Sequence, residues 1–371
     1  MDSGTDSGFA GDAGAFGSGP FLPSDFIVQQ GVGSSGTLPA GVAAVTGGVA
    51  WGWRGDSLQE CGLGFVHLDG GHSHLGVPLF PYSLSSYEGL VLLGGEGPPN
   101  NLATFSAGVP QATGAYGSGR ASATLVAPSL VGGAPTPVVM RTASSGPATV
   151  HRPDFAGGAV WEFQVCDAAA AGVVAVHDSA LLDGGDWLIA VDHCATDDYR
   201  TTLLRVRVDG GVRPELPVTG PSGVVGAAYG QVWVAVLDGN YVGTVLELRS
   251  EDDLSSKQQV AYVEGLSPAD VVVAPAVDGG SPTVYLVGQS VGEVKLGSDV
   301  LVPSGKNVTV ILELTPDGSL VRSGWLDAQF SFPLRGGSLS AHERLWVTGV
   351  CVDGERCIGG TGAAYLFSIP R

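Results

Sequence analysis

Short apolar runs separated by turn-forming residues recur along the whole chain. Seven of these runs have a bulky apolar centre, and successive centres lie 40, 48, 48, 46, 52 and 61 residues apart. A repeat of about 40–50 residues made of short strands is typical of the four-stranded blades of a β-propeller. We therefore expect an all-β, seven-bladed β-propeller with antiparallel four-stranded blades. The centres are Trp51, Val91, Val139, Trp187, Trp233, Tyr285 and Trp346.

Glycine and aspartate mark the expected turns between these strands. The dipeptide Asp-Gly, one of the strongest short-range hairpin signals, occurs seven times in the chain. No window of sufficient length has the period of an amphipathic helix. The apolar fraction of 44% provides ample material for a core and argues against disorder.

The two ends of the repeat pattern complement each other. The last repeat is one strand short, whereas a spare apolar run precedes the first repeat. We expect Phe26–Gln30 to pair with Ala363–Ile369 and close the ring, because closure removes exposed strand edges. The propeller domain would then span residues 25–371.

Residues 1–24 have the composition of a flexible linker rich in glycine, aspartate and serine. They lack the charged and apolar regions of a signal peptide, and no apolar run is long enough for a transmembrane helix. We interpret them as the start left after removal of an export signal, with a lipid anchor on the native chain. A native start with an irregular tail is the alternative.

The chain is strongly acidic, with 17 basic residues, 36 acidic residues and a formal net charge of −19. Three of the basic residues are lysines, and the sequence has no basic stripe. Such a surface repels phosphate backbones, so nucleic acid is not an expected partner. Solubility is the simplest account of the acidity, and a cationic partner is the alternative. We expect no cofactor.

The five cysteines bear on the cellular compartment. Cys351 and Cys357 flank an Asp-Gly turn, so a hairpin would bring their sulfurs within bonding distance. Cys166 and Cys194 end strands of successive repeats and are candidates for a second bridge, which leaves Cys61 free. Unpaired thiols are the alternative. Zinc is disfavoured because no Cys-x2-Cys pair occurs.

One repeat has a recognisable form. It contains Val284-Tyr285-Leu286-Val287-Gly288, a glycine-flanked segment at 292–297, and Val310-Ile311-Leu312-Glu313-Leu314 followed by an Asp-Gly turn. This repeat resembles the blades of secreted bacterial β-propeller proteins, of the type found in myxobacterial surface lipoproteins. The resemblance extends over residues 284–369, and less closely over residues 186–264. It implies an exported propeller, but this broad group has no common chemistry to carry over.

Residues 288–292 match the Gly-x-Ser-x-Gly pattern of a nucleophile elbow around Ser290. That chemistry requires a strand-to-helix turn, in which the helix N-terminus and backbone amides support an oxyanion. Here a strand follows, so we interpret Gly288 and Gly292 as turn glycines of the repeat. His342 is the nearest histidine in the following repeat.

A catalytic funnel would need two carboxylates, or a histidine and a carboxylate, that converge in one place. The adjacent pairs His177-Asp178 and Asp192-His193 are the candidates, although hydrogen bonds to turn backbone are their favoured role.

His72 and His74 form a His-x-His pair on one face of an expected strand, a spacing that can chelate a metal ion. Asp69 is the nearest residue that would serve as a third ligand. Hydrogen-bonding roles are favoured here too, so no metal site is predicted, and these two histidines stay the candidates.

The aromatic residues divide into two sets. Trp51, Trp187, Trp233 and Trp346 share one position of the repeat, so we expect them to fill the space between neighbouring sheets. Aromatics outside that register are the candidates for a binding surface. These are Trp53, Trp161, Trp325, Tyr82 and Tyr116.

Together these patterns predict an extracytoplasmic, non-catalytic binding protein at the cell surface, outer-membrane-associated or secreted. A rigid propeller would present its loops to a protein or a glycan. One alternative is an enzyme that acts on a polysaccharide or cell-wall polymer in the central funnel. Another is an architectural subunit of a surface assembly.

Overall fold

The computed structural model describes residues 15–16, 27–29, 37–45, 48–67, 71–87, 90–96, 102–106, 109–114, 120–128, 135–142, 149–153, 159–164, 175–192, 200–207, 212–217, 220–274, 280–305, 308–326, 339–340, 344–350 and 364–370. Within these residues the regular structure is β, apart from one 3-10 turn, η2 (Leu58–Glu60). None of them belongs to a helix with the length and apolarity that a membrane span requires.

Four of the sheets are four-stranded and antiparallel, and in each of them every strand pairs with the next one along the chain. The first sheet contains β3 (Leu38–Val45), β4 (Gly48–Arg54), β5 (Gly62–His67) and β6 (His72–Gly76). The second contains β7 (Phe80–Tyr87), β8 (Leu90–Glu96), β9 (Leu102–Ser106) and β10 (Val109–Gly114). The third contains β11 (Arg120–Pro128), β12 (Pro135–Thr142), β13 (Thr149–Pro153) and β14 (Ala159–Gln164). The fourth contains β15 (Ala175–Leu181), β16 (Trp187–Asp192), β17 (Thr201–Val206) and β18 (Val212–Pro217).

A longer sheet of nine strands follows. It contains β19 (Val224–Ala228), β20 (Gln231–Leu237), β21 (Gly243–Ser250), β22 (Lys257–Ala274), β23 (Thr283–Leu296), β24 (Asp299–Val302), β25 (Thr309–Leu314), β26 (Leu320–Leu326) and β1 (Ala15–Phe16). Strand β22 bends at Gly265, so that its first part pairs with β21 and its second part pairs with β23. Gly265 has a φ of 73°, and a Cβ there would lie 2.0 Å from the carbonyl oxygen of Glu293. Only glycine fits this position without strain.

The last sheet joins the two ends of the chain. It contains β27 (Leu339–Ser340), β28 (Arg344–Val350), β29 (Ala364–Pro370) and β2 (Ile27–Gln29). Ile27 lies opposite Ser368, and Gln29 lies opposite Leu366. The N-terminal segment therefore supplies a strand to the sheet that also holds the C-terminal strand.

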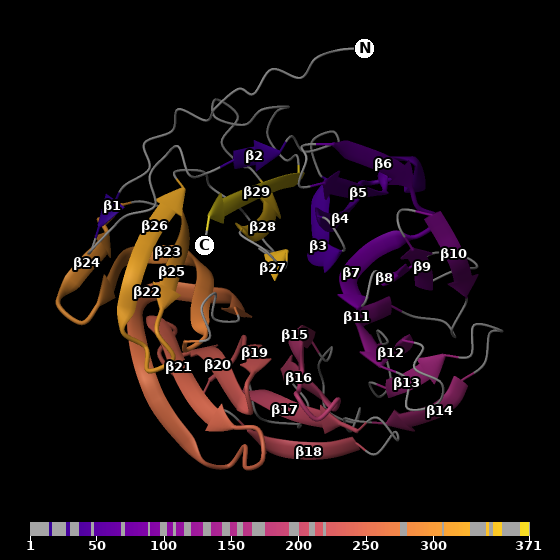
Figure 1. The fold of residues 1–371 in the computed structure, drawn as a ribbon. Helices are drawn as coiled ribbons and strands as arrows, with labels where there is room; N and C mark the ends of the chain where they lie inside the picture. Colours follow the sequence, from indigo (N-terminus) through magenta and orange to yellow (C-terminus); the bar gives the residue numbers. More distant parts are fainter. Residues whose placement is uncertain are drawn as a thin grey trace.

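The sheets lie around a common centre, and the strands nearest that centre are β3, β7, β11, β15, β19 and β27 (Figure 1). Neighbouring inner strands contact one another, as β3 contacts β7 and β7 contacts β11. Antiparallel sheets arranged in this way are the blades of a β-propeller. The predicted all-β propeller fold is therefore correct.

The second strand of a sheet is buried on both faces because neighbouring sheets cover it. All six residues of β16 are buried, as are residues 232–236 of β20. This explains the continuous apolar runs of the sequence, because a strand with one exposed face would alternate apolar and polar residues. The expected core position is confirmed, since Trp51, Trp187, Trp233 and Trp346 are all at most 6% exposed.

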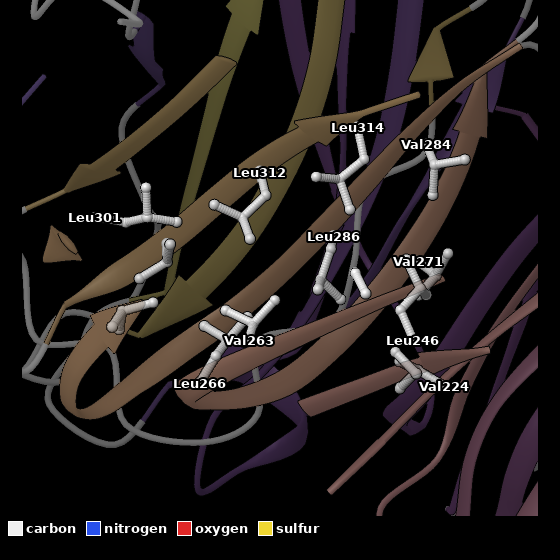
Figure 2. Close-up of a cluster of buried hydrophobic side chains, with 14 of the residues drawn as sticks. Val224, Leu246, Val263, Leu266, Val271, Val284, Leu286, Leu301, Leu312 and Leu314 are labelled. Carbon is white, nitrogen blue, oxygen red and sulfur yellow. The ribbon is translucent and has the colours of Figure 1, made fainter. Parts of the chain in front are cut away.

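Leucine and valine side chains supply most of the core of the nine-stranded sheet, together with Trp233 and Trp325. Figure 2 shows Leu286 and Leu312 among the side chains that meet on this face of the sheet. Each fully buried leucine or valine contributes about 1.5–3 kcal/mol relative to an exposed one. The other labelled side chains are Val224, Leu246, Val263, Leu266, Val271, Val284, Leu301 and Leu314.

Strand β21 carries an ion pair inside the protein. The Nη2 atom of Arg249 lies 2.5 Å from Oε2 of Glu247, and the two side chains are 2% and 3% exposed. Arg249 also donates from Nη1 to the carbonyl oxygen of Leu254, and Lys257 lies 3.3 Å from the other carboxylate oxygen of Glu247. Both charges are thus compensated within the fold.

Candidate functional site

Several inner strands contain a β-bulge at a corresponding place. In β15 the register shifts between Val176 and Asp178, and in β22 it shifts between Pro268 and Asp270. A bulge re-aims the side chain that follows it. Two of these bulges are therefore followed by a carboxylate. The residues that follow the bulges of β3, β7 and β11 are Gly41, Ser83 and Ala123.

The two carboxyl groups meet across the inner strand β19. Asp178 accepts hydrogen bonds from the backbone amides of Ser179 (2.7 Å) and Val225 (2.9 Å). Asp270 accepts one from the amide of Val271 and shares a side-chain hydrogen bond with Asp178. Burial, and after it the charge of Asp178, raise the pKa of Asp270 well above its usual value. The pair therefore holds a proton at pH values at which a single aspartate is ionised.

Asp192, another acid–base candidate, has hydrogen-bond partners of its own. Asp192 is 4% exposed and accepts hydrogen bonds from Oγ1 of Thr201 (2.5 Å) and the amide of Ser222 (2.9 Å). It fixes the chain between the fourth sheet and β19. The side chain of His177 and the whole of His193 lie outside the described residues.

Ser290 lies within the continuous strand β23, and not in the turn that the repeat pattern predicted. Its side chain is 2% exposed, and its Oγ accepts a hydrogen bond from the amide of Val308 at 2.8 Å. The expected turn is wrong because β23 runs on past Gly288 and Gly292 to pair with β24. His342 lies outside the described residues.

The aromatic binding candidates differ in exposure. Trp53 and Trp325 are 4% and 6% exposed, so both rings pack inside the protein. Tyr82 is half-buried, and the guanidinium carbon of Arg54 lies 4.3 Å from its ring centroid. The candidates whose side chains lie outside the described residues are Trp161 and Tyr116.

A set of exposed apolar residues was missed by the sequence analysis. They lie where the turn between β20 and β21 meets the bend of β22, and we call them the tyrosine surface. The carbonyl oxygen of Val242 accepts a hydrogen bond from the amide of Gly265, and Ser290 lies opposite Leu266 beside that bend. The members and their exposures are Tyr241 (57%), Val242 (48%), Tyr262 (37%) and Val291 (59%).

Asp238 organises this surface. Its Oδ1 accepts hydrogen bonds from the amides of Asn240 (3.1 Å) and Val242 (2.8 Å), and its Oδ2 accepts one from the hydroxyl of Tyr262 (2.8 Å). Partial desolvation raises the pKa of Asp238, but these donors outweigh it and hold the pKa below its usual value. The hydrogen bond to Asp238 is also the main reason that the pKa of Tyr262 is raised. The turn and the neighbouring strand are thus fixed to each other.

The backbone of Tyr241 has an unusual conformation. Its φ is 59°, in the left-handed region where glycine and asparagine are normal and a bulky residue is an outlier. The conformation costs a non-glycine residue about 1–2 kcal/mol. The signal in the sequence was a tyrosine in the last position of an Asp-Gly-Asn turn. Tyr229 has a φ of 55° and is also 57% exposed, but it lies in the turn at the other end of β20.

The histidine pair lies on the outer strand of the first sheet. His72 and His74 are both exposed on β6, with ring centroids 5.8 Å apart. Partial burial, and then the nearby His72, lower the pKa of His74. Among the described residues, no three histidine, cysteine, aspartate or glutamate side chains form a group that could hold a metal ion together. Asp69 lies outside those residues.

Of the cysteines, only Cys61 is described, and it is free and buried, as expected. Its thiol lies 3.4 Å from the carbonyl oxygen of Ser57, and burial is the main reason that its pKa is raised. The cysteines of the predicted bridges lie outside the described residues. These are Cys166, Cys194, Cys351 and Cys357.

No protein-family model and no curated protein matches the sequence. Solved structures do match over most of the chain. The BP39L lectin from Burkholderia pseudomallei is 12% identical, with 89% of this chain and 96% of the lectin covered and a TM-score of 0.60. A streptogramin B lyase is 11% identical, with 93% and 98% covered and a TM-score of 0.58. The Dos1 propeller is 10% identical, with 89% and 77% covered and a TM-score of 0.52.

At these identities the likeness shows the β-propeller fold alone. One of the similar structures is a lectin and another is a lyase. A shared fold therefore leaves both binding and catalysis open, and the function has to be argued from the site.

Proposed function

We propose that this chain is a non-catalytic binding protein that works outside the cytoplasm, at the cell surface. A rigid propeller presents the tyrosine surface to a protein or a glycan of the envelope. Loops and turns at the ends of blades are where a rigid scaffold places its binding residues.

The propeller in this proposal is a closed ring of seven blades. The five four-stranded sheets supply five of them. The nine-stranded sheet supplies two, which meet at Gly265 where β22 passes from β21 to β23. The pairing of β2 with β29 supports closure of the ring by the N-terminal segment.

Tyr241 carries the proposal. A left-handed tyrosine costs stability, and this side chain recovers little of that cost through burial because it is 57% exposed. Strain of this kind at an exposed residue points to a functional constraint. Val242, Tyr262 and Val291 extend the exposed apolar area around it, and clustered exposed aromatics are typical of interaction sites.

Carboxylates accompany these rings. Asp238 lies beneath the turn, and the charge of Glu264 acts on Tyr262. Tyrosine faces beside carboxylate acceptors suit sugar rings and their hydroxyl groups, and they equally suit the basic side chains of a protein. A glycan and a protein are therefore the two partner classes to compare.

The extracytoplasmic location rests on the sequence. The resemblance to secreted propeller repeats, the linker-like residues 1–24 and the predicted Cys351–Cys357 bridge all agree with export. The same features support a lipid anchor ahead of residue 24 in the native chain.

The Asp178–Asp270 pair favours a second candidate, acid–base catalysis near the centre of the ring. Glycosidases separate their two carboxyl groups by about 5–9.5 Å, so that a sugar or a water fits between them. Here the two groups are within hydrogen-bonding distance of each other. This spacing suits a shared proton that links β15 and β22 across β19 better than it suits cleavage of a polysaccharide.

The proposal is tested by measuring binding to a glycan array and to solubilised envelope proteins. We expect one of these two classes to bind the full chain, and the binding to fall at least tenfold in Tyr262→Ala and in Val291→Ser. Turnover of a bound glycan, lost in Asp270→Asn, would favour the enzymatic alternative. Binding that both surface variants retain would place the interaction elsewhere on the molecule.

A further inference from the structure

His72 and His74 project from the same face of β6. They are two residues apart on one strand, so their side chains lie on one side of the sheet. Their ring centroids are 5.8 Å apart and the rings are inclined at 48°. Both side chains are exposed, which leaves this face open to solvent.

The ring of His74 is supported by packed aromatic side chains. His74 lies opposite Gly64, which has no side chain to compete for the space. Its ring meets the edge of Trp53 at a centroid distance of 5.7 Å, and Trp53 packs on Trp51 at 4.7 Å. A Cβ at Gly64 would lie 2.4 Å from Nε1 of Trp51, so glycine here lets the indole lie flat against the strand. His74 therefore rests against a fixed aromatic wall.

We propose that His72 and His74 chelate a divalent first-row transition-metal ion. Imidazole is a preferred ligand of nickel, copper and zinc. Two imidazoles that share one metal at a metal–nitrogen distance of about 2.0–2.1 Å have ring centroids roughly 4.5–5.2 Å apart. The observed 5.8 Å exceeds this range slightly, and small side-chain rotations close the difference.

The chemistry of the site follows from its ligand count. His72 and His74 supply two protein ligands in this proposal, and water molecules fill coordination positions that the protein leaves open. Copper and nickel should bind more tightly than manganese or iron, following the general order of divalent affinities. The site lies on the first sheet, so it is separate from the tyrosine surface of β20 to β23 and does not depend on the binding function proposed above.

Isothermal titration of the full chain with nickel chloride tests this site. The matched control is His67→Ala, because His67 is exposed on the same hairpin but belongs to β5. We expect His72→Ala and His74→Ala each to weaken nickel binding at least tenfold, and His67→Ala to leave it unchanged. Circular dichroism should show the same fold in all variants.

Two results would overturn the proposal. One is a nickel affinity of the parent chain that neither His72→Ala nor His74→Ala reduces. The other is that the parent binds nickel no more tightly than the double variant His72→Ala, His74→Ala does. Because His72 has no contact with Trp53 among the ring contacts of the described residues, its substitution keeps the test valid even if His74→Ala disturbs the aromatic wall.

Discussion

Asp270 of β22 hydrogen-bonds through its carboxyl group to Asp178 of β15. The inner strand between them also takes part, since the amide of Val225 donates to Asp178 at 2.9 Å. Three neighbouring inner strands are therefore joined by a pair of acids that needs a proton to stay together.

Stability should depend on pH through Asp270. Because its pKa is raised in the folded protein, the folded state binds this proton more tightly than the unfolded state does. The stabilisation of the folded state by this proton is fully present below the ordinary aspartate pKa of about 3.9. It is lost as the pH rises through the raised pKa of Asp270. In Asp270→Asn the amide mimics the protonated acid, so this loss should disappear. Urea unfolding of both proteins between pH 4 and pH 8 measures the difference.

The control for this experiment is Asp253→Asn. The pKa of Asp253 is lowered, mainly by its hydrogen bonds with Ser255. The stabilisation from these hydrogen bonds is present above the ordinary aspartate pKa of about 3.9 and is lost only at lower pH, so between pH 4 and pH 8 the Asp253→Asn profile should run parallel to that of the parent. A profile of Asp270→Asn that runs parallel to that of the parent would contradict the shared proton.

The buried ion pair of β21 should be costly to break. Arg249→Met removes the buried cation that pairs with Glu247, and the loss of one partner from a buried ion pair typically costs about 3–5 kcal/mol. Chemical denaturation gives this value directly. The pair of Lys295 with Glu293 is about one-third exposed, so Lys295→Met should leave the free energy of unfolding almost unchanged. Equal effects of the two substitutions would show that burial does not decide the strength of these pairs.

Truncation tests the closure of the ring. Removal of residues 1–31 deletes β1 and β2 and exposes the edge of β29, which should lower the free energy of unfolding by several kcal/mol. Removal of residues 1–20 deletes β1, whose two residues pair with β26, but it keeps β2 and should have little effect. Thermal melting of the three proteins compares them. Closure by the N-terminal strand is wrong if all three melt at one temperature.

The oxidised protein should contain a Cys351–Cys357 disulfide. Such a small loop stabilises by roughly 2 kcal/mol through restriction of the unfolded chain. Peptide mapping without reductant detects the bridge. Free thiols at both positions would contradict the predicted disulfide and weaken the argument for export.

The sequence predicted the repeat and the core well, and the reason is physical. The second strand of each blade is covered on both faces, so Trp51, Trp187, Trp233 and Trp346 stand in continuous apolar runs that are visible without a structure. Trp53 was misread as a surface candidate because it falls outside that register. It is buried because Gly62 opposite it leaves room for the ring, with a would-be Cβ only 2.2 Å from the indole.

The site was harder to predict. Asp178 was a candidate, but its partner Asp270 depends on two separate bulges and on the curvature that brings blades together. Neither the two bulges nor the curvature can be recognised from a short sequence motif. The tyrosine surface joins a turn to two neighbouring strands, and its one local signal was Tyr241 after Asp-Gly-Asn.

The most direct test of the binding function compares Tyr241→Gly with Tyr229→Gly. Both tyrosines are left-handed and 57% exposed, but they lie at opposite ends of β20. Glycine should relieve the strain in each case and raise the free energy of unfolding by about 1 kcal/mol. The account predicts that Tyr241→Gly loses binding to the glycan or envelope protein at least tenfold while Tyr229→Gly binds as the parent does. Undiminished binding by a stabilised Tyr241→Gly variant would contradict it.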